Sequence, residues 1–149
     1  MIKSYAELLE KYGTPSYGQW ESDWLSLWRW DIWESVSGRK WCLPFKRMNV
    51  NRDLVTPLDD TFIALDKAGL IGELKTFDGC FCIRNVRGKD KPSIHSWGLA
   101  IDFNALENPL GGPVTFSKEF LAIWRVQGWT VGADFQRLDG QHFQLPSAF

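Results

Sequence analysis

The sequence is poor in the residues that most often bind metal ions or form cross-links. It has two histidines and three cysteines in 149 residues. One residue separates Cys80 from Cys82, which is not the C-x-x-C spacing of zinc or redox motifs. We therefore expect buried free thiols, as a reducing compartment permits. A disulfide from Cys42 to Cys80 or Cys82 is the alternative after release into an oxidising space.

The chain also lacks the charge excess and the apolar runs that nucleic-acid or membrane binding needs. Its net charge of −1 argues against binding to nucleic acid or to an anionic membrane through general electrostatic attraction. The segment from Met1 to Gly13 has neither the apolar core of a secretory signal nor the length of a membrane span. We therefore expect synthesis in the cytoplasm without a signal peptide, no membrane insertion and no nucleic-acid partner.

Apolar residues recur at helical spacing in several parts of the chain. With their N-cap and glycine end signals, these segments predict helices over residues 4–12, 19–36, 56–69 and 117–127. Between Trp41 and Asn51 the composition is that of a loop.

The segment 19–36 holds five of the nine tryptophans. A stripe at helical spacing, such as the one that begins with Trp20 and Trp24, belongs more often to a core than to a binding surface. The alternative is an exposed stacking surface for sugar rings, for which Trp30 and Trp33 are the candidates because they lie off the stripe.

Strict alternation of apolar and polar residues predicts strands over residues 99–104, 129–135 and 141–145. A further strand pair is expected across residues 74–86, with Asp78-Gly79 as its tight turn. In the predicted strands, Asp102 points away from the apolar face, and His142 and Gln144 share the polar face. A ligand can therefore reach the carboxylate and the imidazole.

His95, Asp102 and His142 together form a candidate metal site. Two imidazoles and one carboxylate are a recurrent ligand set for a catalytic zinc ion, which keeps its fourth position open for water. Asp139 lies three residues before His142, where a general base could face that water. The structural alternative for Asp139 is a turn-forming residue before Gly140.

Other charged residues compete with this assignment or extend it. Glu107 and Asp134 are the rivals of Asp139 for the role of base, but both lie outside its tight spacing to the second histidine. A basic cluster runs directly into the His95 segment, which suggests a site rather than a solvated face. Its members are Arg84, Arg87, Lys89 and Lys91, with Asp90 as a partial offset.

Two motifs in this chain resemble a known family. The run Ser93-x-His95-x-x-Gly98-x-Ala100-x-Asp102, followed further along by Asp139-x-x-His142-Phe143, is similar to the D-alanyl-D-alanine carboxypeptidase and L-alanyl-D-glutamate endopeptidase group of zinc peptidases. These are cell-wall enzymes that share the fold of the Hedgehog signalling domain. The resemblance covers residues 80–145 and has both motifs in the expected order.

The resemblance implies a set of roles. One Zn²⁺ ion would be held by His95, Asp102 and His142, and Asp139 would be the catalytic acid and base. Bacterial peptidoglycan would be the partner.

The family also has an arginine upstream of its first histidine, which holds the substrate carbonyl or carboxylate. Arg84 matches this position, and Arg87 is the alternative. Ser93 would orient the ligand loop or touch the substrate. Where many relatives have a Trp-Gly-Gly-Asp-Trp-like segment, this chain has residues 131–135, so substrate preference does not carry over.

Together these inferences predict a single α+β domain over residues 1–149, with a central antiparallel sheet and flanking helices. Residues 1–55 would form a helical, tryptophan-rich part, and residues 56–149 the catalytic core. We expect a monomeric L-alanyl-D-glutamate endopeptidase of the phage endolysin type, which reaches the wall through a holin-type pore. A D-alanyl-D-alanine carboxypeptidase is the first alternative. A zinc-stabilised wall-binding or phage tail module without activity is the alternative from another class.

Overall fold

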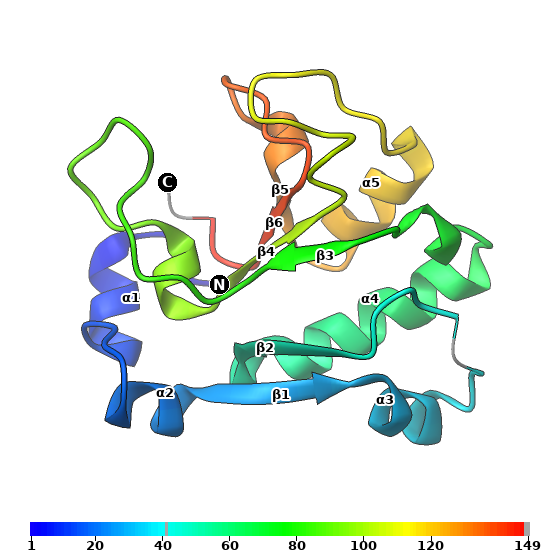
Figure 1. Cartoon of the computed structure of the whole chain (residues 1–149), viewed down its shortest axis with the longest axis horizontal. Coiled ribbons are helices and arrows are strands. Elements are labelled where there is room, and N and C mark those ends of the chain that lie inside the picture. The colour runs from blue at the N-terminus through cyan, green and yellow to red at the C-terminus, as the bar shows by residue number, and fades with distance from the viewer. Residues whose placement is uncertain (41, 148–149) are drawn as a thin grey trace.

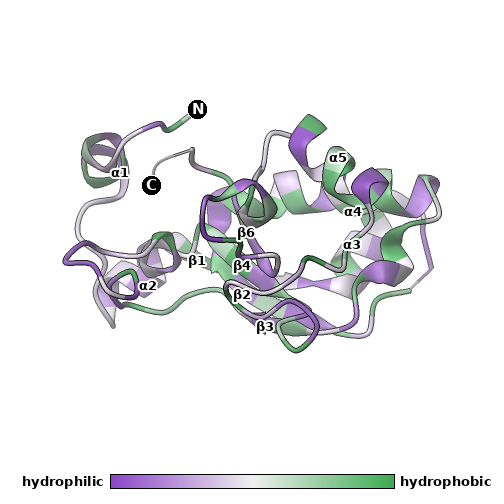
Figure 2. Cartoon of the chain, turned by 90° about the horizontal axis from the view of Figure 1, so that it is seen from above, coloured by the Kyte–Doolittle hydropathy of each residue, from purple (hydrophilic) through white to green (hydrophobic). Residues whose placement is uncertain are grey.

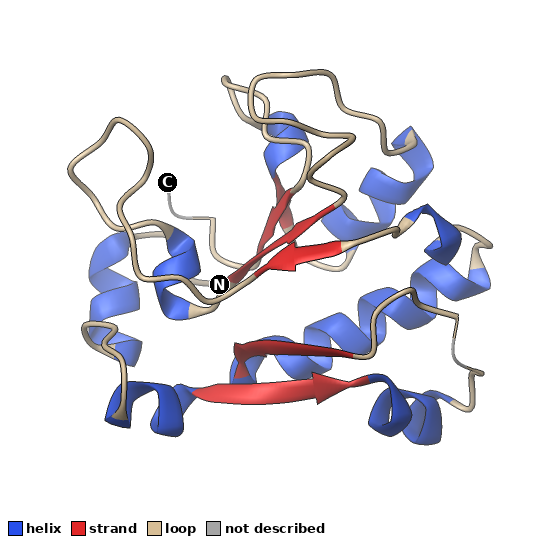
Figure 3. Cartoon of the chain, in the orientation of Figure 1, coloured by secondary structure: helices blue, strands red, loops and turns tan. Residues whose placement is uncertain are grey.

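The computed structural model describes residues 1–40 and 42–147. In this part of the chain the α-helices are α1 (Tyr5–Tyr12), α2 (Gln19–Trp24), α3 (Trp30–Ser37), α4 (Val55–Lys67) and α5 (Lys118–Val126). The strands are β1 (Leu25–Arg29), β2 (Arg47–Asn51), β3 (Phe77–Gly79), β4 (Ala100–Phe103), β5 (Thr130–Val131) and β6 (His142–Gln144). Long loops connect these elements (Figure 3). Two 3-10 turns matter for the site, η3 (Ile94–Trp97) and η4 (Gly132–Asp134).

The strands form two antiparallel sheets, so the predicted α+β class is confirmed. The larger sheet has four strands in the order β3-β4-β6-β5, and the smaller one pairs β1 with β2. In Figure 1 the larger sheet lies above the β1–β2 ribbon. Figures 1 and 2 both show α1 at one end of the strands and α3, α4 and α5 at the other.

Helix α4 joins the two sheets into one core. Its Phe62 side chain is fully buried, and its ring lies 5.3 Å from that of Trp28 in β1 and 6.4 Å from that of Phe103 in β4. The same ring lies 6.3 Å from Trp124 of α5. Such edge-on aromatic contacts add to the stability that burial provides. The larger sheet, which carries the site, thus rests on a continuous aromatic layer.

Three of the four predicted helices lie where the apolar periodicity placed them. Ser4 caps α1 with a reciprocal Ser4–Glu7 capping box, and Ser117 caps α5 by accepting a hydrogen bond from the backbone N–H of Phe120. Gly69, with φ at 72°, follows the end of α4. Among the helices of the described ranges, none combines the length and apolarity that crossing a bilayer requires.

The helix predicted over residues 19–36 is wrong in its middle, where the chain forms β1. Pairing with β2 buries Trp28 to 2% exposure and leaves Leu27 46% exposed, as alternation in a strand requires. Its partner β2 lies in the stretch where a loop was expected, although Trp41 itself is outside the described residues. Residues 1–55 are therefore not wholly helical, because pairing with a distant segment overrides local periodicity.

The strand pair predicted across residues 74–86 is also wrong. Only β3 forms, and it pairs with β4 rather than with the segment that follows it. Asp78 is not a hairpin turn residue, since its carboxylate accepts hydrogen bonds from the Ala105 N–H at 2.8 Å and the Thr76 hydroxyl at 2.7 Å. Residues after Gly79 instead run beside η3, where the Cys82 N–H donates to the His95 carbonyl.

The strand predicted over residues 129–135 is shorter than expected. It ends after Val131, because the chain turns into η4. The Gly132 carbonyl accepts hydrogen bonds from the N–H groups of Phe135 at 3.1 Å and Asp139 at 3.0 Å. This turn draws the Asp139 segment towards the sheet.

The tryptophans of the first third belong mainly to the core. Trp20, Trp28 and Trp33 are buried, and Trp30 is half-buried. The indole N–H of Trp33 donates to the Asp59 carbonyl at 3.4 Å. An exposed sugar-stacking role for Trp33 is therefore wrong.

The three cysteines are free thiols, as expected. Only Cys80 is buried, so the predicted burial is wrong for Cys42 and Cys82, which are exposed. Burial raises the pKa of the Cys80 thiol well above its ordinary value. Cys80 is therefore an inert core residue whose backbone carbonyl faces the site.

The aromatic layer predicts a large stability difference between two positions of α5. Trp124→Ala should lower the free energy of unfolding by about 3–5 kcal/mol, since the side chain is fully buried and leaves a cavity. Val126→Ala, at a position 83% exposed, should change it by less than about 0.5 kcal/mol. Urea denaturation followed by circular dichroism measures both, and equal effects would contradict the packing described.

Candidate metal centre

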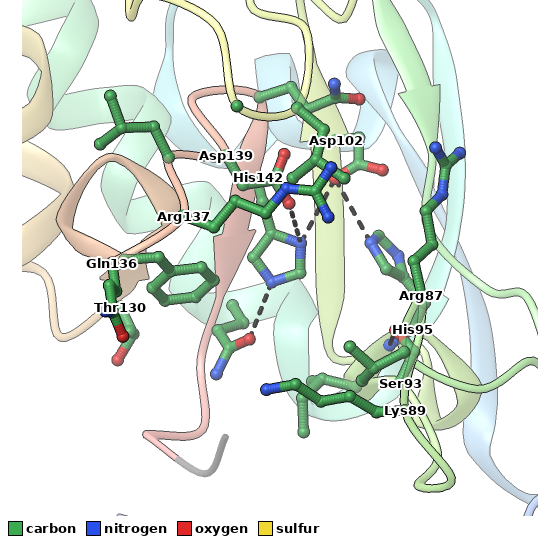
Figure 4. A pocket seen from close by; sticks show the side chains of 18 of the residues that line it. Arg87, Lys89, Ser93, His95, Asp102, Thr130, Gln136, Arg137, Asp139 and His142 are labelled. Atoms are coloured by element: carbon green, nitrogen blue, oxygen red, sulfur yellow. Dashed lines mark hydrogen bonds and ion pairs between the residues drawn. The ribbon is translucent and has the colours of Figure 1, made fainter.

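His95, Asp102 and His142 meet in the structure. One ligand atom from each lies within 4.8 Å of the others. The Asp102 Oδ1 atom is 3.3 Å from His95 Nε2 and 3.4 Å from His142 Nδ1. Dashed lines mark both contacts in Figure 4. Two ligand atoms that share a tetrahedral zinc ion at ordinary bond lengths lie roughly 3.4 Å apart. The spacing therefore fits a metal ion among these atoms.

Adjacent strands and one turn position the three side chains. Asp102 in β4 and His142 in β6 are direct cross-strand partners, which brings their side chains onto the same face. His95 lies in η3, and Gly98, with φ at 65°, turns the chain from η3 into β4. A Cβ atom at Gly98 would lie 3.0 Å from the Asn51 backbone nitrogen, so glycine suits this position for two reasons.

The Cys80 carbonyl orients the buried His95 ring. It lies 2.7 Å from His95 Nδ1. A carbonyl oxygen only accepts hydrogen bonds, so Nδ1 carries the ring hydrogen and Nε2 keeps a free lone pair. That lone pair faces Asp102 Oδ1, which lies 3.3 Å from Nε2.

Gln144 orients His142 in the same way. The Gln144 Nε2 group donates to the Pro146 carbonyl at 2.8 Å, which turns its Oε1 atom towards His142 Nε2, also at 2.8 Å. Nε2 of His142 must then donate, and Nδ1 keeps the lone pair. The shared polar face of His142 and Gln144 was predicted, but this contact was not.

The residues present fit a bound cation. His95 Nε2 and Asp102 Oδ1 are buried and lack a hydrogen-bond partner in the described structure. Buried polar atoms normally have partners, and a metal ion between these two would supply one. Burial would raise the pKa of Asp102, but the two imidazoles outweigh it and hold the pKa well below its usual range. The three residues can therefore hold a metal ion with an anionic carboxylate.

Asp139 lies beside this group without joining it. Its Oδ2 atom is 3.9 Å from His142 Nδ1, and its backbone carbonyl accepts the His142 N–H at 3.0 Å. Burial, with a smaller contribution from the Asp102 charge, raises the pKa of Asp139 above its ordinary value. A Cβ atom on Gly132 would lie 2.1 Å from the Asp139 carbonyl oxygen, so only glycine allows this approach.

The two rival bases are placed differently. Asp134 lines the cleft but is held by Arg125 through two hydrogen bonds of 2.8 Å. Glu107 is not among the residues that line the cleft. Of these three carboxylates, Asp139 is the one that lies beside the candidate ligands. Among the described residues it forms no ion pair with a lysine or an arginine.

A cleft of about 1380 Å³ surrounds the three candidate ligands. All four members of the predicted basic cluster line it, on the segment that leads into η3, and Arg137 lines it on the segment before Asp139. Sequence reasoning missed Arg137. Its position two residues before Asp139 was the available signal.

Arg84 and Ser93 form hydrogen bonds with residues of η3, the turn that carries His95. The Ser96 hydroxyl accepts from the Arg84 N–H at 3.2 Å and donates to the Arg84 carbonyl at 3.0 Å. The Ser93 hydroxyl accepts from the His95 N–H at 3.3 Å and caps η3. Arg84, Arg87 and Ser93 all line the cleft.

Comparisons with known proteins agree with this geometry. Residues 87–145 match the model of a D-alanyl-D-alanine carboxypeptidase family. The chain matches no curated protein and no solved structure. The matched range contains the three candidate ligands and Asp139, whereas Arg84 lies before it. Residues 87–145, which carry the candidate metal ligands, are thus similar to the D-alanyl-D-alanine carboxypeptidase family.

Proposed function

We propose that the chain is a zinc endopeptidase that cleaves peptidoglycan stem peptides between L-alanine and D-glutamate. The similarity of residues 87–145 to the D-alanyl-D-alanine carboxypeptidase family supports peptidoglycan peptides as the substrate class. The shape of the cleft supports an endopeptidase, because its volume of about 1380 Å³ exceeds the roughly 300–1000 Å³ of ordinary ligand pockets. Residues on both sides of the metal centre line it, so a peptide can lie across the three ligands.

Zinc is the metal that suits this donor set best. Two imidazoles and a carboxylate are recurrent ligands of catalytic zinc, and three protein ligands leave a position free. When bound, zinc supplies a Lewis acid that polarises the scissile carbonyl and activates water at neutral pH. His95 and His142 each offer a lone pair whose direction a fixed hydrogen bond sets.

Asp139 would be the general base and then the general acid. It lies next to the metal group, and its raised pKa brings proton transfer closer to neutral pH. Its carboxylate would accept the proton of the attacking water and return it to the leaving amine.

Arg84 would hold the substrate carbonyl oxygen as charge develops on it. The Arg84 charge lowers the pKa of Asp139, which supports a position near the reacting groups and favours Arg84 for this role. Ser93 would act mainly by holding the His95 backbone, as its hydrogen bond indicates.

Cleavage at this bond would separate the cross-linked stems from the glycan and weaken the wall. We therefore propose a lytic, endolysin-like role for a monomeric enzyme. A holin-type pore would be its route to the wall.

A D-alanyl-D-alanine carboxypeptidase is the second candidate. The description of the matching family favours it. The two activities differ in their products, because a carboxypeptidase releases free D-alanine and keeps the stem attached to the glycan. A non-catalytic zinc-stabilised wall-binding or tail module is the third candidate, and the placement of Asp139 beside the ligands argues against it.

Product analysis tests the proposal. A digest of purified peptidoglycan, followed by mass spectrometry, should give stems that begin with D-glutamate. Asp139→Asn should lower the rate by about 10²–10⁴-fold while zinc stays bound. Asp134→Asn is the matched control in the same cleft and should leave most activity. Free D-alanine with an intact stem would refute the endopeptidase choice, and unchanged lysis by Asp139→Asn would refute the enzyme.

Removal of the metal should both inactivate and destabilise the protein. Zinc that binds only the folded site stabilises it by about 2.7 kcal/mol at a free concentration 100 times its Kd. For a chain of this size, chelation should then lower Tm by roughly 5–10 °C. Differential scanning calorimetry with and without chelator measures the shift, and elemental analysis counts the metal. A metal-free protein with an unchanged Tm would contradict the site.

Gln144 should control zinc affinity through His142. Gln144→Leu removes the acceptor at His142 Nε2 and should weaken zinc binding by about 10–100-fold. Gln144→Glu keeps an acceptor oxygen and should retain affinity. Gln136→Leu, an exposed position in the same cleft, is the control. Competition with a chromogenic chelator measures the Kd, and equal affinity for all four proteins would exclude the role.

A further inference from the structure

The walls of the cleft carry positive charge that the protein does not neutralise. Five basic side chains line it, Arg84, Arg87, Lys89, Lys91 and Arg137. The lysines and arginines in ion pairs of the described residues are Lys11, Arg29, Arg39 and Arg125, and the other close contacts of carboxylates are with the imidazoles of His95 and His142. The five cleft cations therefore form no ion pair with a carboxylate of the described chain.

The acidic residues of the cleft do not offset these cations. Asp102 faces the two imidazoles, and Asp134 is bound by Arg125. Asp139 faces His142, at 3.9 Å from Nδ1, and forms no ion pair with any of the five cations. The chain as a whole has a net charge of −1, so the positive charge is a local property of the cleft. A cleft lined by one sign of charge concentrates ligands of the opposite sign.

The cations lie on two opposite walls. Figure 4 shows Arg87 and Lys89 on the His95 side of the site, whereas Arg137 extends across the His142 side. A guanidinium group binds a carboxylate through two parallel hydrogen bonds, which suits it to recognise that group specifically. Carboxylates on a bound peptide could therefore be held on both sides of the metal group.

We propose that the cleft selects stem peptides with a free carboxylate next to the cleaved bond, and that Arg137 is a specificity-determining residue. This proposal rests on the proposed function. The carboxylate nearest to an L-alanyl-D-glutamate bond is the α-carboxylate of D-glutamate. Its carboxamide form has the same shape without the charge. The enzyme should thus discriminate against amidated stems.

A pair of matched peptides tests this selectivity. One is acetyl-L-Ala-γ-D-Glu-L-Lys amide, and the other has a carboxamide in place of the D-glutamate α-carboxylate. Binding is measured by calorimetry with the zinc-loaded Asp139→Asn protein, which keeps the peptides intact. The free acid should bind about tenfold or more tightly, as a charge-assisted hydrogen bond provides.

Substitutions in the same background identify the residue. Arg137→Gln should weaken binding of the free acid about tenfold and leave binding of the amide unchanged, which removes the discrimination. Arg47→Gln, an exposed β2 position outside the cleft, is the charge-matched control and should change neither Kd. Equal binding of the two peptides, or equal weakening of both by Arg137→Gln, would overturn the proposal.

Its failure is distinguishable from that of the proposed function. The product digest with the unmodified enzyme identifies the cleaved bond, whereas the binding comparison depends only on charge. If discrimination appears only for a free C-terminal carboxylate of a D-alanyl-D-alanine peptide, the assignment to D-glutamate is overturned.

Discussion

The Asp102 carboxylate, with one oxygen facing both imidazoles, is the constraint on which the site depends. A buried charge must be compensated, and here Asp102 Oδ1 lies within 3.4 Å of a nitrogen on each side. Cross-strand pairing of β4 with β6 supplies His142, and the Gly98 turn supplies His95. Phe103 of β4 and Phe143 of β6 both pack against Trp124 of α5 in the aromatic layer beneath the sheet. The fold thus places three donors around one point before any ion arrives.

Backbone carbonyls determine which nitrogen each histidine presents. The Cys80 carbonyl acts directly on His95, and the Pro146 carbonyl acts on His142 through the Gln144 amide. As a result, one ring offers Nε2 and the other offers Nδ1. The two carbonyls that orient the rings, those of Cys80 and Pro146, lie far from one another in the sequence. Such fixed outer contacts commonly raise the affinity of a metal site.

Residue types and spacing predicted the ligand group, the position of Asp139 and the helices α1, α4 and α5, because those signals are local. Two strand pairings could not be predicted in this way, because they join segments that are distant in the sequence. The strand β1 forms because residues 25–29 pair with β2, and β3 pairs across to β4 rather than to its own neighbour. The helical periodicity that begins at Trp20 did not indicate the first pairing, and the Asp78-Gly79 turn signal did not indicate the second. The contact of Gln144 with His142 likewise needed the strand geometry, although the shared face was predicted.

The two aspartates of the site show how environment separates residues of one type. Asp102 faces two imidazoles, which outweigh the effect of burial and keep its pKa low. Asp139 is also largely buried, but it lies 3.9 Å from the nearer imidazole, so burial dominates and its pKa rises. The first is therefore suited to hold a cation, and the second to exchange a proton. This separation depends on Gly132, since a side chain there would push the Asp139 backbone away from the sheet.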